Sequence, residues 1–169
     1  MMSNGCERAN SVSVLEGLIS KYQDLVGKEI HVGSWLEIDQ QRIDAFARVT
    51  GDEQWIHVDP QRAAKESPYG CTIAHGFLTL SLLPLLTESN HPDFFESNYP
   101  GMRLRVNYGL NKLRFPAPVL CGARVRARTV VQSVAAVRNG AQIVYLLTIE
   151  IEGEEKPACV AEQVMRVYP

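Results

Sequence analysis

Apolar and polar positions in the first part of the chain follow the spacing of a helix. Between residues 11 and 22, apolar side chains recur three and four positions apart, which predicts a helix with one buried face. They are Val14, Leu15, Leu18 and Ile19, with Tyr22 following. Residues 1–10 lack this pattern and are predicted to be a disordered start, whereas residues 32–38 favour a short strand.

A second helix is predicted after Asp39, a residue type that caps helix N-termini. Its apolar face recurs at Ile43, Phe46 and Val49. Gly51 is predicted to end it, and an irregular segment, residues 52–59, follows. Pro60 then suits the first turn of a brief third helix.

The stretch from residue 77 to residue 86 is apolar on nearly every side of a predicted helix. Its apolar members are Phe77, Leu78, Leu80, Leu82, Leu83, Leu85 and Leu86. A helix that is apolar all round must be buried on all sides, so we place a long central helix at residues 74–88. Pro84 predicts a bend in it.

The second half of the chain follows the period-two pattern of strands. Residues 124–131 and 142–152 alternate clearly, and Asn139-Gly140 between them is the strongest short signal for a hairpin. Two more strands are predicted at residues 102–108 and 158–167. These elements indicate an α+β fold in one domain, residues 1–169, with an antiparallel sheet around the central helix and an N-terminal helical extension at about residues 11–22.

Composition is typical of an ordinary globular protein. The 169 residues are 46% hydrophobic and 21% charged, with a net charge of -2, which gives no reason to expect nucleic acid or an anionic membrane as a partner. The N-terminus lacks the apolar core of a secretory signal, and no apolar run is long enough to cross a bilayer. Four cysteines without paired spacing indicate reduced thiols in a cytoplasmic protein; they are Cys6, Cys71, Cys121 and Cys159.

The segment after Gly51 carries the residues best suited to chemistry. Asp52 and His57 stand five positions apart around the apolar pair Trp55-Ile56, and an acid and a base on one anchored loop can hold a single water between them. Taken alone, a residue in the position of Asp52 is more often part of a turn, and one in the position of His57 is more often a partly buried histidine whose hydrogen bonds are satisfied. The pair together favours a hydration site.

Two further groups carry weaker signals. Gly76 opens the central helix, where backbone N–H groups have no intrahelical partner and can donate to a thioester oxygen; the structural alternative is that glycine only relieves crowding. His75 beside it is expected to cap or pack, and with Cys71 it makes too small a set for a metal site. Arginines of the predicted strands, Arg124, Arg126 and Arg128 among them, fit a solvated strand face better than a phosphate-binding edge.

The segment from Val49 to Pro60 resembles the hydratase motif of MaoC-like dehydratases and (R)-specific enoyl-CoA hydratases. In that motif a Gly-Asp pair is followed by a His five residues after the Asp, and then by a small residue, here Ala63. Residues 73–82 (Ile-Ala-His-Gly-Phe-Leu-Thr-Leu-Ser-Leu) and residues 107–118 resemble the nodulation protein N branch of the same family. The resemblance covers about residues 25–168.

This resemblance implies a hotdog fold and a homodimer whose two sheets join edge to edge. It assigns Asp52 and His57 to the activation of water and the Gly76 N–H to the thioester oxygen. Some members place a serine in the central helix where this chain has Pro84, so Ser81 is retained only as a weaker candidate for a pocket hydroxyl. Gln54-Trp55 replaces an Asn-Pro of many members, which bears on substrate choice more than on catalysis.

The implied function is that of a hydro-lyase in fatty acid metabolism. It would add water to a trans-2-enoyl-CoA to give an (R)-3-hydroxyacyl-CoA, reversibly, with no metal or redox cofactor and with coenzyme A as part of the substrate. Two alternatives stay open. One is an acyl-CoA thioesterase, which uses a similar carboxylate and helix N-terminus, and the other is a non-catalytic module that binds an acyl-CoA or a signal.

Overall fold

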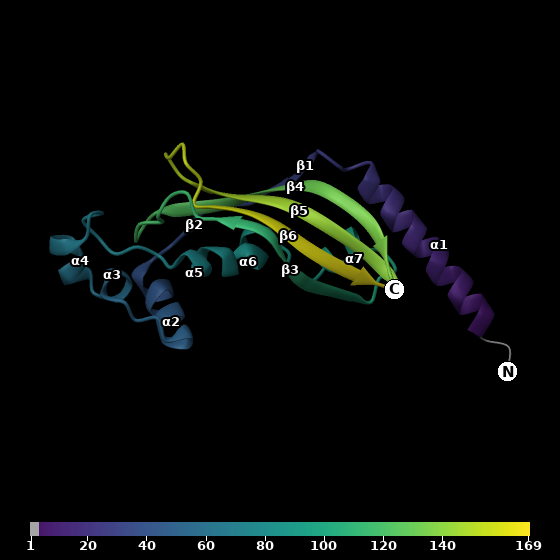
Figure 1. Cartoon of the computed structure of the whole chain (residues 1–169), viewed down its shortest axis with the longest axis horizontal. Coiled ribbons are helices and arrows are strands. Elements are labelled where there is room, and N and C mark those ends of the chain that lie inside the picture. Colours follow the sequence, from purple (N-terminus) through teal and green to yellow (C-terminus); the bar gives the residue numbers. More distant parts are fainter. Residues whose placement is uncertain (1–3) are drawn as a thin grey trace.

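The structure, a computed structural model, describes residues 4–169, with side chains from residue 12 onward (Figure 1). Its helices are α1 (Asn4–Gln23), α2 (Gln40–Thr50), α3 (Trp55–Val58), α4 (Pro60–Glu66), α5 (Gly76–Ser81), α6 (Leu83–Leu86) and α7 (Phe94–Asn98). Its strands are β1 (Glu29–Val32), β2 (Leu36–Glu37), β3 (Leu104–Arg114), β4 (Arg124–Val137), β5 (Gly140–Ile151) and β6 (Cys159–Tyr168).

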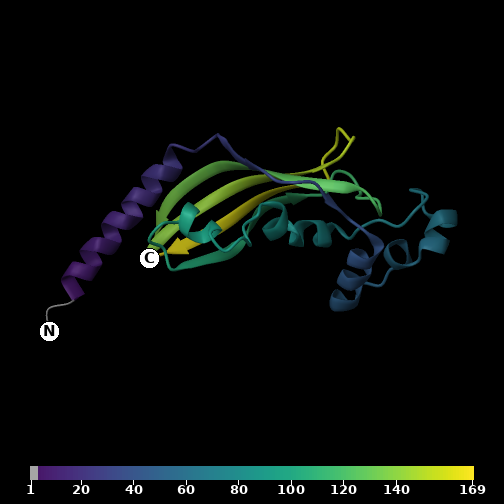
Figure 2. The ribbon, with the colours of Figure 1, turned by 180° about the vertical axis from the view of Figure 1, so that it is seen from behind.

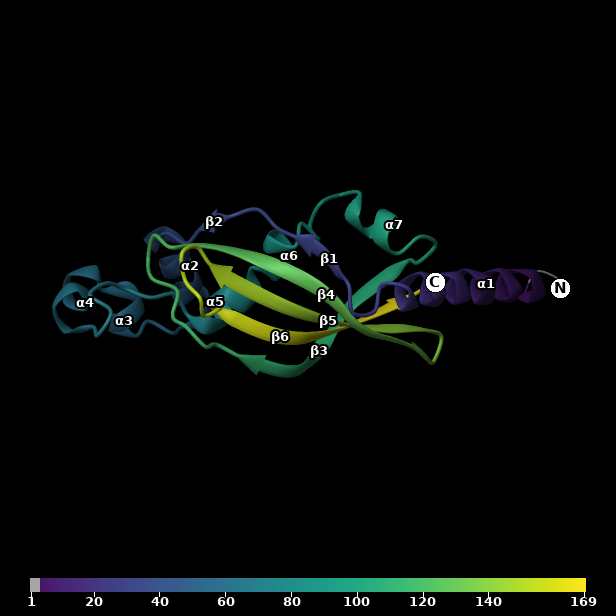
Figure 3. The same ribbon diagram turned by 90° about the horizontal axis from the view of Figure 1, so that it is seen from above.

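The strands form one curved sheet in the order β1-β4-β5-β6-β3, with the short β2 also paired to β4. All pairs between these strands are antiparallel, as the sequence predicts. Arg138 and Asn139, the latter with φ of 59°, make the turn between β4 and β5. The predicted hairpin is therefore confirmed, with Gly140 as the first residue of β5. The view from above shows β3 at one edge of the sheet (Figure 3).

One face of the sheet is buried because side chains alternate along each strand. On β4 and β5 the buried positions are Val125, Ala127, Thr129, Val131, Ile143, Tyr145, Leu147 and Ile149. The sheet curves around α5 and α6, which lie under this face (Figure 2). The expected packing of a sheet against central helices is therefore confirmed.

The expected central helix is divided in two. A single helix at residues 74–88 is wrong, because α5 ends at Ser81 and α6 begins at Leu83. Pro84 has no backbone N–H, and its ring conflicts with the carbonyl four residues earlier, so a straight α-helix cannot pass through it. The N–H of Leu85 instead donates to the carbonyl of Leu82 at 3.0 Å, as in a tighter turn.

The N-terminal helix is longer than predicted. It begins at Asn4, so the expected disordered start is wrong from that residue onward; polar residues can extend a helix without adding to its apolar stripe. Leu18 and Tyr22, on the predicted stripe, are buried. Its first turns project away from the sheet at the end opposite α2, α3 and α4 (Figure 1). Within residues 4–169, no helix has the length and apolarity needed to span a membrane.

The arginines of β4 form a ladder of ion pairs on the other face of the sheet. Arg124 pairs with Glu152 at 3.0 Å and Arg126 with Glu150 at 2.7 Å. Arg128 contacts both Glu150, at 2.6 Å, and Glu29, at 3.0 Å. These three arginines therefore belong to a paired strand face, as predicted, and do not form a free basic strip.

Candidate active site

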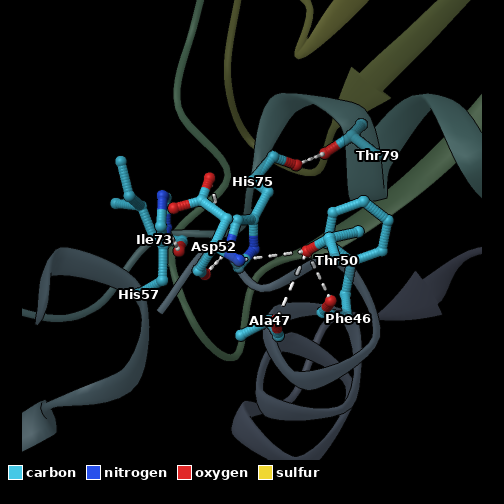
Figure 4. A network of polar contacts seen from close by, with 8 residues as sticks. All are labelled: Phe46, Ala47, Thr50, Asp52, His57, Ile73, His75 and Thr79. Carbon is cyan, nitrogen blue, oxygen red and sulfur yellow. Dashed lines mark hydrogen bonds and ion pairs between the residues drawn. The ribbon is translucent and has the colours of Figure 1, made fainter. Parts of the chain in front are cut away.

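The candidate site begins where α2 ends. Asp39 caps the start of this helix as predicted, its Oδ1 accepting from the Arg42 N–H at 2.8 Å. At the other end Gly51 adopts a left-handed conformation, with φ of 77°, and stops the helix. The Thr50 hydroxyl donates to the Phe46 carbonyl at 2.8 Å and accepts from the Asp52 N–H at 3.4 Å (Figure 4). These contacts fix the point at which the chain leaves α2. The Asp52 side chain that follows is 58% exposed.

His57 lies on α3, a single helical turn inside the segment predicted to be irregular, and is 8% exposed. Its Nδ1 is 2.7 Å from the Ile73 carbonyl oxygen, which can only accept, so Nδ1 carries the hydrogen. In the neutral ring Nε2 therefore holds the lone pair. Burial lowers the pKa of His57, and the nearby His75 adds to this effect, which outweighs the opposing influence of the Ile73 carbonyl and Asp52.

His75 belongs to the same site, although the sequence suggested only capping or packing. Its ring stacks on that of His57, with centroids 3.7 Å apart, and it is 4% exposed. Its Nε2 donates to the backbone carbonyl of Asp52 at 2.9 Å and lies 4.0 Å from a carboxylate oxygen of the same residue. The ring thus joins the Asp52 loop to the start of α5 (Figure 4).

Gln40 is a supporting residue that the sequence analysis missed. Its amide nitrogen donates to the His57 carbonyl and to Asp44, both at 2.7 Å. Its amide oxygen accepts from the hydroxyl of the buried Thr72 at 2.5 Å. Gln40 therefore connects α2, α3 and the segment before α5. No local pattern marks it, because its partners lie up to 32 positions away in the chain.

Trp55, one of the apolar pair between Asp52 and His57, is half-buried. The Arg62 guanidinium lies over its ring, 4.5 Å from the centroid. Arg62 also pairs with Glu66 at 2.8 Å on α4. The indole thus holds α3 to α4 and fixes the segment that carries His57.

Gly76 is the first residue of α5, directly after His75, and no side chain caps this helix. A Cβ at this position would lie 2.9 Å from the Phe115 ring, so glycine allows Phe115 to pack against the backbone. Glycine therefore relieves crowding at this position, as the structural alternative states. Its N–H can still donate to a thioester oxygen. Ser81 is exposed and its hydroxyl donates to the Phe77 carbonyl at 2.6 Å; the structure does not turn it toward Asp52 and His57.

Asp52, His57 and His75 each offer a potential ligand atom, all within 4.8 Å of one another. Their geometry fits acid–base chemistry better than metal binding. One nitrogen of each ring donates to a backbone carbonyl, the Nδ1 of His57 to Ile73 at 2.7 Å and the Nε2 of His75 to Asp52 at 2.9 Å, so these two nitrogens are not free to bind an ion. Cys71, Cys121 and Cys159 are free thiols, and among the residues with described side chains Cys71 joins no such cluster; Cys6 lies outside them.

Comparisons with known proteins agree with the motif and with the fold. The MaoC-like domain matches residues 21–152. The chain is 48% identical over 141 residues to 3-hydroxyacyl-thioester dehydratase Z of Mycobacterium tuberculosis, covering 83% of this chain and 89% of that protein. It is 44% identical over 144 residues to nodulation protein N of Rhizobium meliloti, covering 85% and 86%.

Among solved structures, the (R)-hydratase from A. caviae involved in PHA biosynthesis aligns with a TM-score of 0.60 at 25% identity. The alignment covers 83% of this chain and 98% of that one. The antiparallel sheet curved around α5 and α6 is therefore the hotdog fold that the sequence resemblance implies. Since the domain match extends over most of the chain, the protein belongs to the MaoC-like dehydratase family.

Proposed function

We propose that the protein is a hydro-lyase that adds water reversibly to a trans-2-enoyl-CoA to give an (R)-3-hydroxyacyl-CoA. The observation that carries the proposal is the meeting of the Asp52 carboxylate and the His57 imidazole beside the start of α5. Their ligand atoms lie within 4.8 Å of one another, a spacing that one water can bridge. The names of relatives support the same chemistry, since one is a 3-hydroxyacyl-thioester dehydratase and another an (R)-hydratase.

In the proposed reaction His57 and Asp52 bind the attacking water together. The Nε2 lone pair of His57 accepts a proton from the water as its oxygen forms a bond to C3 of the enoyl group. The same proton then goes to C2 on the same face, so the product has gained one hydroxyl and one hydrogen. Asp52 orients the water and balances the charge that develops on the imidazole.

The thioester carbonyl is assigned to the Gly76 N–H. Electrons from the C2–C3 double bond move toward this carbonyl as oxygen attacks, and an N–H group at the first turn of α5 faces the oxygen that becomes negative. Coenzyme A is part of the substrate, and the reaction requires no metal or redox cofactor. We further propose that the enzyme acts in fatty acid metabolism, which uses acyl-CoA substrates, and in the cytoplasm, where unpaired cysteines stay reduced.

We also propose that the active form is a homodimer joined at β3. This strand lies at the edge of the sheet and exposes apolar side chains, among them Leu104, Val106, Tyr108 and Leu110. A long apolar edge strand is a surface that proteins normally cover by pairing. Light scattering of the purified protein tests this, and a monomer at micromolar concentration would contradict it.

The function is tested by the loss of enoyl absorbance when the protein meets crotonyl-CoA or a medium-chain trans-2-enoyl-CoA. Asp52→Asn and His57→Ala should each lower the rate by about 100- to 10,000-fold, the usual contribution of an acid–base group. Glu53→Gln, at the exposed carboxylate next to Asp52 in the chain, is the matched control and should keep most of the activity. A thiol reagent in the same assay detects released coenzyme A. Thiol release would identify a thioesterase, and acyl-CoA binding without either reaction would identify a binding module.

A further inference from the structure

A cavity of about 700 Å³ lies under the buried face of the sheet, at the end of the molecule where α1, α6 and α7 meet (Figures 1 and 3). It is partly open to solvent, and Asp52, His57 and Gly76 do not line it. Its volume falls in the range of sites for small molecules, about 300–1,000 Å³. The pairing of the charged side chains in its wall indicates which ligand it can hold.

Arg105 on β3 is half-buried in this wall. It lies opposite Val167 of β6 in the strand register, and Val167 is fully buried. Residues that lie opposite one another in an antiparallel pair point to the same face of the sheet. The register therefore directs the Arg105 side chain to the buried face, a position that charged residues avoid unless they are paired.

Neutral groups hold the Arg105 guanidinium in place. Its Nη2 donates to the Ser89 carbonyl at 3.3 Å. Its central carbon lies over the rings of Phe94 and Tyr99, 5.1 and 5.9 Å from their centroids. A guanidinium has five N–H donors in a planar fork, and the Ser89 carbonyl is its one acceptor among the described residues. These contacts orient the side chain, but they leave its charge and most of its donors uncompensated.

The acidic residues around the cavity do not pair with Arg105. Glu29 belongs to the ion-pair ladder on the other face of the sheet. The side chain of Asp93 is 87% exposed, and Glu88 is exposed as well. A half-buried cation without a protein counter-ion is unfavourable and attracts an anion from solution.

We propose that this cavity binds an organic carboxylate, whose oxygens accept hydrogen bonds from the Arg105 guanidinium. The planar fork of a guanidinium matches a carboxylate with two parallel N–H···O bonds. Lys21 and Lys28, which are exposed at the rim, add positive charge around the opening and favour the entry of an anion.

The rest of the wall favours an acid with a hydrocarbon body over inorganic phosphate. Apolar side chains from α6, α7 and the sheet line the same cavity, among them Leu83, Phe94, Leu147 and Met165. A hydrocarbon body that covers them is removed from water together with them, whereas phosphate has no apolar part. The carboxylate has two sources, a free acid or the far end of a dicarboxylic acyl-CoA. The second source rests on the proposed function, and the first does not.

The test is a calorimetric titration that compares hexanoate with hexanamide, a neutral molecule of nearly the same shape. The parent should bind hexanoate more tightly by about tenfold or more, which corresponds to one hydrogen bond to a charged group. Arg105→Gln removes the charge and should bring the two affinities together, whereas Arg105→Lys should retain part of the preference. Arg103→Gln is the matched control, since Arg103 is an exposed neighbour outside the wall, and it should leave the preference unchanged.

Kinetics of the same variants identify the source of the carboxylate. They compare kcat/KM for trans-2-dodecenoyl-CoA with that for the same thioester bearing a carboxylate in place of its terminal methyl group. A parental preference for the dicarboxylic thioester, lost in Arg105→Gln, assigns the site to the end of the substrate. No such preference, with hexanoate still bound through Arg105, assigns the site to a free acid.

The proposal is overturned if neither measurement shows a preference for the carboxylate that Arg105→Gln removes. If the parent hydrates no enoyl-CoA, crotonyl-CoA included, the proposed function fails and the hexanoate titration alone decides about the cavity.

Discussion

The imidazole rings of His57 and His75 lie face to face, with centroids 3.7 Å apart and an angle of 26° between their planes. Each ring is held by one backbone carbonyl, Ile73 for His57 and Asp52 for His75. The second contact matters for the proposed reaction, because it fixes the loop on which the Asp52 carboxylate is carried. We therefore infer that His75 is a positioning residue for Asp52.

Replacing His75 with phenylalanine keeps a ring against His57 but removes the donor to the Asp52 carbonyl. We expect kcat for enoyl-CoA hydration to fall by about 10- to 100-fold, because an acid–base pair acts efficiently only when it is held in place. KM should change less. His75→Gln, whose amide N–H can reach the same carbonyl, should recover part of the loss. Steady-state kinetics of the three proteins check this, and a parental kcat in His75→Phe would show that the contact is only structural.

The environment of His57 predicts how activity depends on pH. Burial, with a further contribution from His75, lowers the pKa of His57 from its ordinary value of 6.5. The proposed base must be unprotonated, so kcat/KM should fall on the acidic side with a midpoint below 6.5. A pH–rate profile measures this midpoint. Proton NMR of the imidazoles, assigned with His57→Asn, measures the pKa itself, and an acidic midpoint above 6.5 would contradict the assignment of His57.

The lowered pKa of His57 also determines whether the free energy of unfolding rises or falls with pH. Between the folded pKa of His57 and 6.5, the unfolded chain binds more protons than the folded one. The contribution of His57 to the free energy of unfolding should therefore decrease as pH falls through this window and level off below the folded pKa. Comparing the parent with His57→Asn in urea at several pH values isolates this contribution, because the variant lacks the titrating ring.

Local sequence patterns predicted the elements whose partners are near in the chain. Asp39 contacts an N–H three residues away, and Asn139 lies in the turn between adjacent strands, directly before Gly140. His75 could not be placed in this way. It reaches His57 because the segment before α5 runs beside α3, where the Ile73 N–H donates to the Ile56 carbonyl at 3.1 Å. Neither helical nor strand periodicity encodes a pairing of this kind.

The central helical segment shows a second limit of predicting burial from the pattern of apolar residues. The apolar run from Phe77 to Leu86 predicted burial, and Leu78, Leu83 and Leu86 are buried as expected. Phe77 and Leu85 are exposed, because the sheet covers only one side of α5 and α6. A run of apolar residues could predict that this segment is largely buried, but it could not show which side the fold leaves open.

Gln40 provides a test of how the candidate site is supported. Gln40→Ala removes the donor to the His57 carbonyl and leaves the buried Thr72 hydroxyl without its acceptor. Unpaired buried groups cost about 1–3 kcal/mol, so the free energy of unfolding should fall by this amount and kcat should fall with it. Gln41→Ala, at an exposed neighbouring position, is the control and should change stability by less than about 0.5 kcal/mol. Urea denaturation measures both, and equal stability of the two variants would show that the Gln40 contacts contribute little.

Two glycines offer a matched pair in which one substitution should have opposite effects. Gly33, between β1 and β2, lies so close to α6 that a Cβ there would be 2.0 Å from the Leu86 carbonyl oxygen. Gly33→Ala must push this segment away from α6, and we expect a loss of about 1–3 kcal/mol in the free energy of unfolding.

Gly17→Ala is the counterpart, because nothing lies within 4 Å of a Cβ at that position of α1. Glycine inside a helix is about 0.5–1 kcal/mol less favourable than alanine, so this variant should be more stable than the parent by that amount. Both are measured by urea denaturation of the purified proteins. A Gly33→Ala protein as stable as the parent would mean that the segment between β1 and β2 can move away from α6 freely.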